Sequence, residues 1–196
     1  MSLELVNTIA TTVTAVVIAA TAIAALVQLR HMRAANQITA LLAVQNELDC
    51  ADFRDAEVVV REEFLEMLED PGFCRYVIAM SRPGFKGKMD ERYLKVRQSA
   101  LLLANTFENL GSMVKNGMID SNLVLDIYCW SVNGYWNRLA PLTALMRAAS
   151  GMPALYENFE YLAVLSKRFM KEYPATYPPN VERLPMEVPP AAKGLL

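Results

Sequence analysis

A run of residues without a charged side chain, 5–29, lies near the N-terminus of this chain of 196 residues. As an α-helix it would be about 37 Å long, enough to cross a hydrocarbon core of about 30 Å with some tilt. Its eleven leucine, isoleucine and valine side chains favour insertion into a membrane by about 3 to 7 kcal/mol. The sequence therefore predicts a transmembrane anchor over residues 1–30.

The residues that flank this run predict its orientation. The segment before it carries Glu4 but no lysine or arginine, whereas a cleaved signal peptide begins with a positive region. Arg30, His31 and Arg33 follow the run at once, and positive flanks stay on the cytoplasmic side. We therefore expect the N-terminus outside and the remainder in the cytoplasm. Three scattered cysteines without a CxxC pair agree with a reducing compartment.

Small residues recur at four-residue spacing within the span. Such spacing lets helix backbones approach closely, and packing drives helix association in lipid. Alanine and threonine could also merely fill an anchor, so association with a second copy or with another membrane protein is left open. One row consists of Thr11, Ala15 and Ala19, and another of Ala20 and Ala24.

The membrane helix is expected to continue into the cytoplasm as a stalk. No proline or glycine interrupts the chain before Pro71, and apolar residues keep helical spacing after the span. A helix with one apolar stripe must bury it against the rest of the domain or against a partner. The spacing indicates a stripe of Ile38, Leu41, Leu42, Gln45 and Leu48.

Chain breaks beyond the stalk predict a further helix and a loop. A second helix is expected from about Asp52 to Glu69, where Asp-Pro-Gly ends it. Residues 73–80 would form one or two buried helical turns, and 81–90 a loop. This loop lacks the spacing of a phosphate-binding loop.

The third long helix has the clearest pattern in the chain. Its apolar residues are separated alternately by three and four positions, which is a heptad seam over three repeats. Asp90 or Glu91 begins the helix and Gly117 ends it. We expect it at the centre of a bundle. The seam comprises Tyr93, Val96, Ala100, Leu103, Phe107, Leu110 and Val114.

The stretch 116–142 is interpreted as a joint between packed helices. Met118 and Ile119 should pack inward, and Gly134 should let a neighbouring helix come close. The stretch holds no histidine, so a nucleophile beside a base is not available there. Trp130 and Trp136 are therefore expected to anchor the core or a partner surface rather than to stack on a ligand.

The last helix should begin in the Gly151–Pro153 segment and run to about Tyr173. The proline-rich residues 174–196 form an extended tail, either solvated or able to dock as polyproline. We thus divide the chain into an anchor, 1–30, a cytosolic bundle with its stalk, 31–173, and this tail.

Charged clusters are interpreted without a cofactor. Residues 49–70 hold nine carboxylates, but the sole histidine is His31, so we expect a solvated acidic face and no metal site. The net charge of −2 and the lack of interleaved aromatics predict no nucleic-acid partner, and no small-molecule substrate is identified. A basic patch could meet anionic lipid or the acidic helix of this or another subunit; it comprises Arg82, Lys86, Lys88 and Arg92.

Residues 107–163 resemble a family of small bacterial membrane-anchored helical proteins that is catalogued as a domain of unknown function. The features that carry this resemblance are Phe107, the turn "VKNGMID", the segment "YWNRLAPL" and "YENFEYL". The resemblance implies a bacterial inner-membrane protein with one N-terminal membrane helix and a cytosolic helical region. It implies no catalytic residues and no cofactor.

The expected fold is all-α, with a single transmembrane helix that continues into a cytosolic bundle of about five helices. The expected function is a non-enzymatic, membrane-anchored interaction or scaffolding protein, in contact with lipid, and either self-assembling or an accessory subunit of a larger membrane complex. One alternative is a membrane-perturbing or pore-forming effector. Another is a carboxylate metal enzyme built on the acidic helix.

Overall fold

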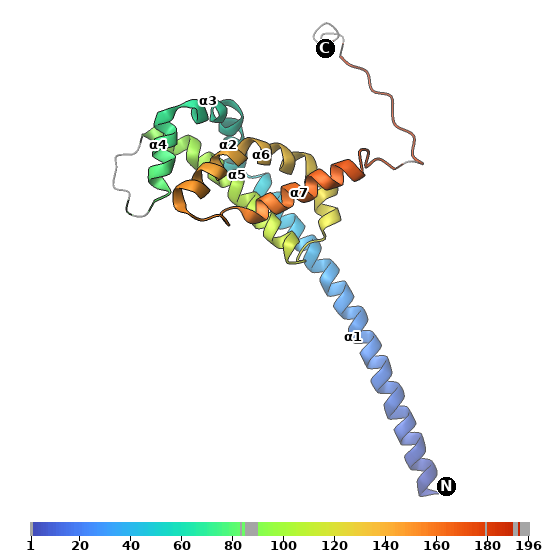
Figure 1. Ribbon diagram of the computed structural model, residues 1–196. Helices are drawn as coiled ribbons and strands as arrows, with labels where there is room; N and C mark the ends of the chain where they lie inside the picture. Colours follow the sequence, from blue (N-terminus) through green and yellow to red (C-terminus); the bar gives the residue numbers. More distant parts are fainter. Residues whose placement is uncertain (1, 83, 85–89, 179, 190–191, 193–196) are drawn as a thin grey trace.

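The computed structural model describes residues 2–82, 84, 90–178, 180–189 and 192, and these parts are all-α (Figure 1). The prediction of an all-α fold is confirmed. The expected count of about five helices is too low, because seven occur in the parts described. In chain order they are α1 (Leu3–Leu48), α2 (Ala51–Glu62), α3 (Phe64–Glu69), α4 (Pro71–Met80), α5 (Glu91–Lys115), α6 (Ser121–Ser150) and α7 (Glu157–Glu172).

The additional helices arise where the expected second helix is broken. It ends at Glu62, and after the intervening Glu63 α3 turns Phe64 and Met67 into the core, with 0% and 2% of their surface exposed. Helix α4 is a complete helix because Asp70 caps it, accepting a hydrogen bond from the Gly72 amide at 2.7 Å. Of the expected loop at 81–90, residues 83 and 85–89 lie outside the described residues.

Helix α5 lies at the centre of the bundle, and α2, α6 and α7 pack against it. The seam residues from Val96 to Val114 are buried, while Tyr93, near the N-terminal end, is half-buried. The ring of Phe107 stacks on Phe159 of α7 and on Tyr135 of α6, with centroids 5.1 and 5.3 Å apart. One central helix therefore joins the other layers of the bundle.

The crossing of α7 over α5 leaves no room for a side chain at Gly111. At Gly111 the backbone of Asn158 lies so near that a Cβ atom would meet its carbonyl carbon at 2.6 Å. One turn earlier, Glu108 accepts hydrogen bonds from the Phe159 amide and the Asn158 side chain, both at 2.8 Å. Glu108 thus caps the start of α7 from a neighbouring helix.

The turn between α5 and α6 follows the expected chemistry except at one residue. Gly117 has a φ of 66°, and Asp120 caps α6 by accepting from the amides of Asn122 and Leu123 at 2.9 and 3.1 Å. Ile119 is buried, but Met118 is 58% exposed, which corrects the expectation that both pack inward. In a tight turn two successive side chains point in different directions, so only one reaches the core.

The last helix begins later than the sequence indicates. Residues 151–156 form turns, and α7 starts at Glu157 instead of near Pro153. Tyr156 adopts the left-handed conformation, with φ 58°, which is uncommon outside glycine. Its buried ring and the hydrogen bond from its hydroxyl to Asn105 Oδ1, at 3.0 Å, hold that conformation in place.

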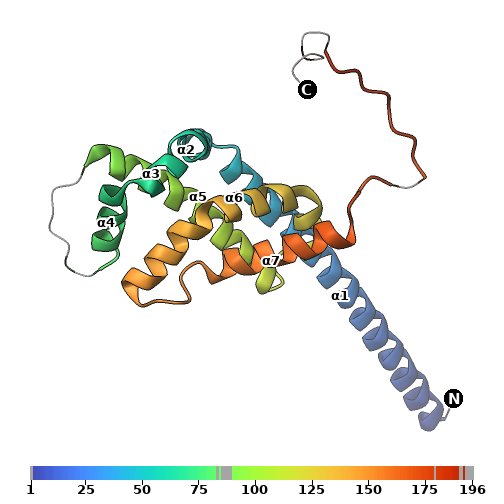
Figure 2. The same cartoon turned by 45° about the horizontal axis from the view of Figure 1, so that its top comes forward.

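Helix α1 and the tail leave the bundle in different directions. Figures 1 and 2 show α1 as a straight rod that enters the bundle with only its C-terminal part. The described part of the chain after Glu172 contains no α-helix and extends away from the bundle (Figure 1).

Candidate functional site

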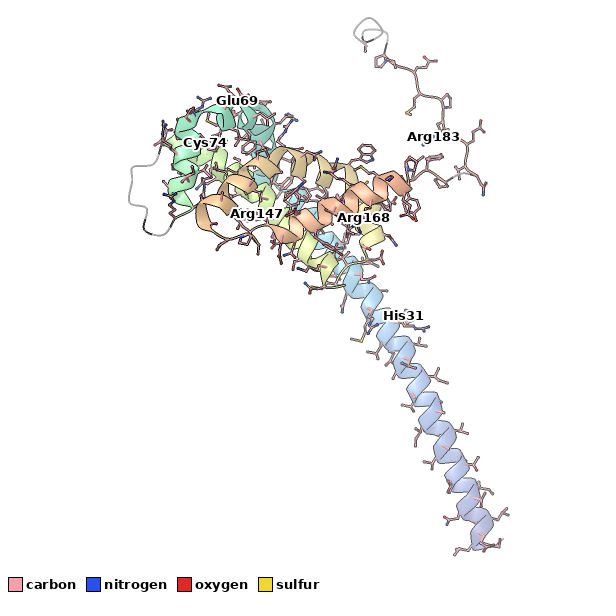
Figure 3. The ribbon with its side chains drawn as sticks, in the orientation of Figure 1. His31, Glu69, Cys74, Arg147, Arg168 and Arg183 are labelled. Carbon is pink, nitrogen blue, oxygen red and sulfur yellow. The ribbon has the colours of Figure 1, made fainter. Side chains whose placement is uncertain are left out.

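The apolar part of α1 is uncovered along its whole length. Every residue from Ser2 to Asn36 is exposed, and Figure 3 shows their side chains projecting from the rod on all sides. Among the described helices, α1 is the one that is long and apolar enough to cross a membrane. Such an apolar surface is far larger than soluble monomers expose.

The threonines of this segment bond within their own helix. Each hydroxyl donates to the carbonyl oxygen four residues earlier, which leaves no hydroxyl proton that needs water. The donors are Thr8, Thr11, Thr12, Thr14 and Thr21, at 2.8–2.9 Å. Their polar atoms are thus compatible with an apolar surrounding.

Basic side chains follow directly where the apolar segment ends. Arg30, His31 and Arg33 are exposed, and Figure 3 places His31 on the rod between the apolar segment and the bundle. At about 1.5 Å of rise per residue, the three lie within about 5 Å along the axis. This group is suited to the headgroup side of a membrane boundary.

The stalk attaches to the bundle through a face that only partly coincides with the expected stripe. Val44 is buried, Ala40 and Leu48 pack against the core, and the Thr106 hydroxyl of α5 donates to Glu47 Oε1 at 3.2 Å. Ile38 and Leu42, which the sequence places in the buried stripe, are 58% and 53% exposed.

The expected stripe was therefore partly wrong: it mixed two faces of one helix. Leu48 packs against the core and Leu41 is half-buried, whereas Ile38, Leu42 and Gln45 are exposed. A single sequence cannot tell which of two neighbouring apolar rows finds a partner within its own chain.

The acidic and basic segments meet within this chain. Lys95 Nζ lies 2.7 Å from Glu63 Oε1, and Arg92 lies 3.7 Å from Glu66. Such exposed pairs contribute little to stability, but they place part of the basic patch on the acidic helices. Arg82 is exposed, and the predicted patch residues Lys86 and Lys88 lie outside the described residues.

In the parts of the chain described, no group of three histidine, cysteine or carboxylate residues is placed to hold a metal ion.

The two tryptophans have different surroundings. Trp136 is half-buried and packs edge-on against Phe159, with ring centroids 5.1 Å apart. Trp130 is 73% exposed.

Gly134, one turn further along α6, has open space where a Cβ would be, so the predicted close approach of a neighbouring helix is wrong. The close crossing lies at Gly111 instead.

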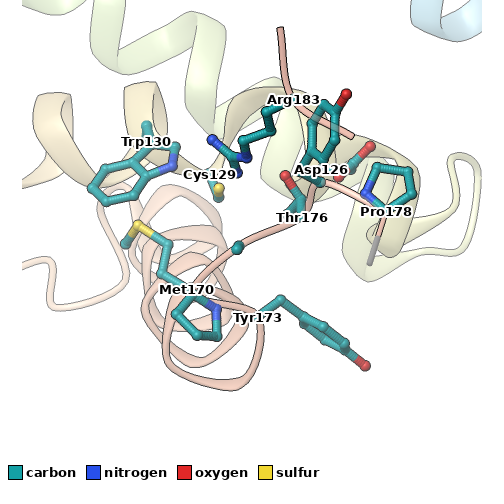
Figure 4. A pocket seen from close by; sticks show the side chains of 11 residues that line it. Asp126, Cys129, Trp130, Met170, Tyr173, Thr176, Pro178 and Arg183 are labelled. Atoms are coloured by element: carbon teal, nitrogen blue, oxygen red, sulfur yellow. The ribbon is translucent and has the colours of Figure 1, made fainter. Parts of the chain in front are cut away.

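Trp130 borders a groove of about 440 Å³ between α6, the end of α7 and the tail. Figure 4 shows Arg183 of the tail and Cys129 of α6 facing it. The Arg183 guanidinium lies 4.7 Å from the centre of the Tyr177 ring. Burial raises the pKa of the Cys129 thiol, so this group stays protonated and is a poor nucleophile. The groove is therefore suited to contact rather than to nucleophilic chemistry.

The Tyr135 hydroxyl lies in an environment that shifts its pKa strongly. Its hydroxyl donates to Glu57 Oε1 across the α6–α2 contact. Burial, followed by this hydrogen bond to a carboxylate, raises the pKa of Tyr135 well above its ordinary value. A phenol held neutral in this way is a structural donor.

Two residues important for the bundle were not singled out from the sequence. Glu108 and Gly111 lie three positions apart in "FENLG" (107–111), and together they set the α5–α7 crossing. The available signal was a charged residue and a glycine within an otherwise apolar helix, but either is also common on an exposed face.

These observations define a class of protein: an all-α bundle carried on one continuous, uncovered apolar helix that is long enough to cross a membrane. Residues 15–166 match the family model described as Domain of unknown function (DUF4760), and the chain belongs to this family. The match includes the second half of the apolar segment and continues through most of α7. No curated protein and no solved structure matches the chain.

Proposed function

We propose that this chain is a membrane-anchored, non-enzymatic interaction protein that acts as a scaffold or as an accessory subunit of a larger membrane complex. The observation that carries the proposal is the uncovered apolar surface of α1 over residues 5–29. Transfer of such a helix into lipid removes this surface from water, and its threonine hydroxyls are already hydrogen-bonded.

The proposed location is a bacterial inner membrane, with the N-terminus outside and the bundle in the cytoplasm. Arg30 and Arg33 support this orientation because they follow the span, while the residues before it include no lysine or arginine. The three free cysteines, Cys50, Cys74 and Cys129, are consistent with a reducing compartment.

Interaction is favoured over catalysis by the kind of surface that the bundle presents. Apolar side chains remain exposed on the stalk and on α6, including Ile38, Leu42, Ile127 and Trp130. Large aromatic and aliphatic residues in such positions are typical of contact surfaces.

The anchor is tested with the full-length chain expressed in bacterial cells. We expect the protein to stay with the membranes after alkaline carbonate extraction, and intact-mass measurement to find the apolar segment still attached. Release into the carbonate supernatant, or a mature mass without the segment as for a cleaved signal sequence, would overturn the proposal.

The orientation is tested with a membrane-impermeant maleimide on intact cells. Cysteine introduced by Ser2→Cys should react from outside, whereas the exposed native Cys50 should react only after permeabilisation. Labelling of Cys50 in intact cells would show the opposite orientation.

The interaction is tested by the mass of the complex extracted from its native membrane. This mass should exceed that of one chain, and a strictly monomeric species would contradict a scaffold or subunit.

A further inference from the structure

We propose that the partner of the stalk is a second copy of this chain, which docks along one defined face of α1 marked by Ile38 and Leu42. The two copies would form a parallel two-helix coiled coil that continues from the cytoplasm into the membrane. This inference rests on the proposed membrane anchor and adds to it the identity of the partner and the contact face.

The exposed stalk residues are the starting point. Ile38 and Leu42 lie beyond the basic flank, on the part of α1 outside the apolar segment, yet they are 58% and 53% exposed. The bundle covers the face of Ala40, Val44 and Leu48. At about 100° per residue, the direction midway between Ile38 and Leu42 lies roughly 140° around the helix from the covered face. One apolar face is therefore used within the chain and the other is left free.

The free face continues into the membrane segment because α1 is one uninterrupted helix. About five turns of 3.6 residues make 18 residues, so side chains 18 positions apart share a face. Ala20 lies 18 residues before Ile38, and Ala24 lies 18 residues before Leu42. The small-residue pair in the span and the exposed pair on the stalk thus point in the same direction.

The other row of small residues leads to the bundle. About seven turns make 25 residues, which relates Ala15 to Ala40 and Ala19 to the buried Val44. A helix packed along Thr11, Ala15 and Ala19 would meet the bundle once it left the membrane. The tertiary structure therefore favours one of two rows that the sequence leaves equivalent.

The free face has the spacing of a coiled-coil seam. From Ala20 its residues are separated by four, three, four, three and four positions, and His31 at the membrane boundary is the polar member. These residues are Ala20, Ala24, Val27, His31, Ala34 and Ile38. All of them are exposed in the structure.

Self-association is the simplest way to cover such a seam. Two copies inserted in the same orientation are parallel, and a parallel two-fold pair brings the same residues of each helix together. The same face reaches Val6 at the N-terminal end, so the strip from Val6 to Leu42 is about 54 Å long and about 10 Å wide. It covers roughly 540 Å² of each copy, which approaches the roughly 800 Å² that each partner contributes to a stable interface.

The face is tested by disulfide crosslinking of the full-length chain in its membranes. In a Cys50→Ser background, Ile38→Cys and Leu42→Cys should form disulfide-linked homodimers under mild oxidation, because seam residues of paired helices come within bonding distance. Asn36→Cys and Ala43→Cys are matched controls, since both are exposed stalk residues directed away from the seam. We expect most of the chain to crosslink at 38 and 42 and only a small fraction at 36 and 43.

Within the span, Ala20→Cys should crosslink and Ala15→Cys should not. Equal crosslinking at all stalk positions, or crosslinking at 15 instead of 20, would overturn the assigned face. Crosslinks to a different protein would overturn the second copy as the partner. A chain that stays in carbonate-washed membranes without any crosslink would refute the pairing alone, whereas a chain absent from those membranes would refute the anchor.

A non-cysteine variant gives an independent measurement. The double change Ile38→Lys and Leu42→Lys should convert the extracted complex to a lower mass without altering membrane retention or the tryptophan emission of the bundle. An unchanged mass would contradict the proposal.

Discussion

Gly111 of α5 and Asn158 of α7 are in direct backbone contact: a Cβ placed on Gly111 would lie 2.6 Å from the carbonyl carbon of Asn158 and closer still to its oxygen. Real Cβ atoms do not approach backbone this closely, and a backbone carbonyl cannot rotate away as a flexible side chain does. The absence of a side chain at Gly111 is therefore what allows α7 to seat on the central helix.

The first prediction concerns this crossing. Gly111→Ala should destabilise the full-length chain by about 2 to 3 kcal/mol, because α7 must shift to admit the methyl group. Urea unfolding in detergent, followed through the tryptophan emission of the chain, to which the half-buried Trp136 contributes, measures the change. Gly134→Ala is the matched control: it lies in a helix with open space around it and should stabilise by about 0.5 to 1 kcal/mol. Equal effects of the two changes would show that the crossing is not tight.

The second prediction concerns the cap that α5 provides for α7. Glu108→Ala should cost about 1 to 2 kcal/mol, because the Phe159 amide and the Asn158 side chain lose their acceptor. Glu108→Gln retains one acceptor oxygen and should recover part of the loss. The same urea titration tests both variants, and an alanine variant as stable as the parent would rule out a capping role.

The third prediction concerns pH. The Tyr93 hydroxyl donates to Asp70 Oδ2 at 2.5 Å, and this hydrogen bond, together with that from the Gly72 amide, lowers the pKa of Asp70. Below about pH 5 the folded state then binds fewer protons at Asp70 than the unfolded state does. The contribution of this hydrogen bond to the free energy of unfolding is therefore fully present above the unfolded pKa of about 3.9. It is lost as the pH falls through the lower pKa that Asp70 has in the folded state.

Tyr93→Phe should therefore weaken the loss of stability between about pH 5 and pH 3. The measurement is the free energy of unfolding of each chain at several pH values in this window. Tyr161→Phe, which changes an exposed tyrosine on α7, should leave the acid dependence of the parent unaltered. A Tyr93→Phe curve parallel to the parent would mean that the hydrogen bond does not bias Asp70.

Local signals predicted much of the chain because each one acts over a few residues. The uncharged run predicted the long apolar part of α1, the three-four spacing marked the face of α5 that is buried, and Asp90 and Gly117 marked the start and the stop of α5. Hydrophobic periodicity and capping depend on neighbours within one or two turns, so a single sequence contains them.

Other features were decided by the tertiary structure. The sequence could not distinguish the contact made by Gly111 from the open surface at Gly134, nor the packed Trp136 from the exposed Trp130. It also could not show that α1 meets the bundle through Val44 and leaves Ile38 free. The sequence by itself determined that the chain is helical, where the long helices α1, α5 and α6 lie, and which of them is apolar enough for a membrane. Only packing between distant segments decided which face of each helix is covered, because burial depends on what the rest of the chain brings against it.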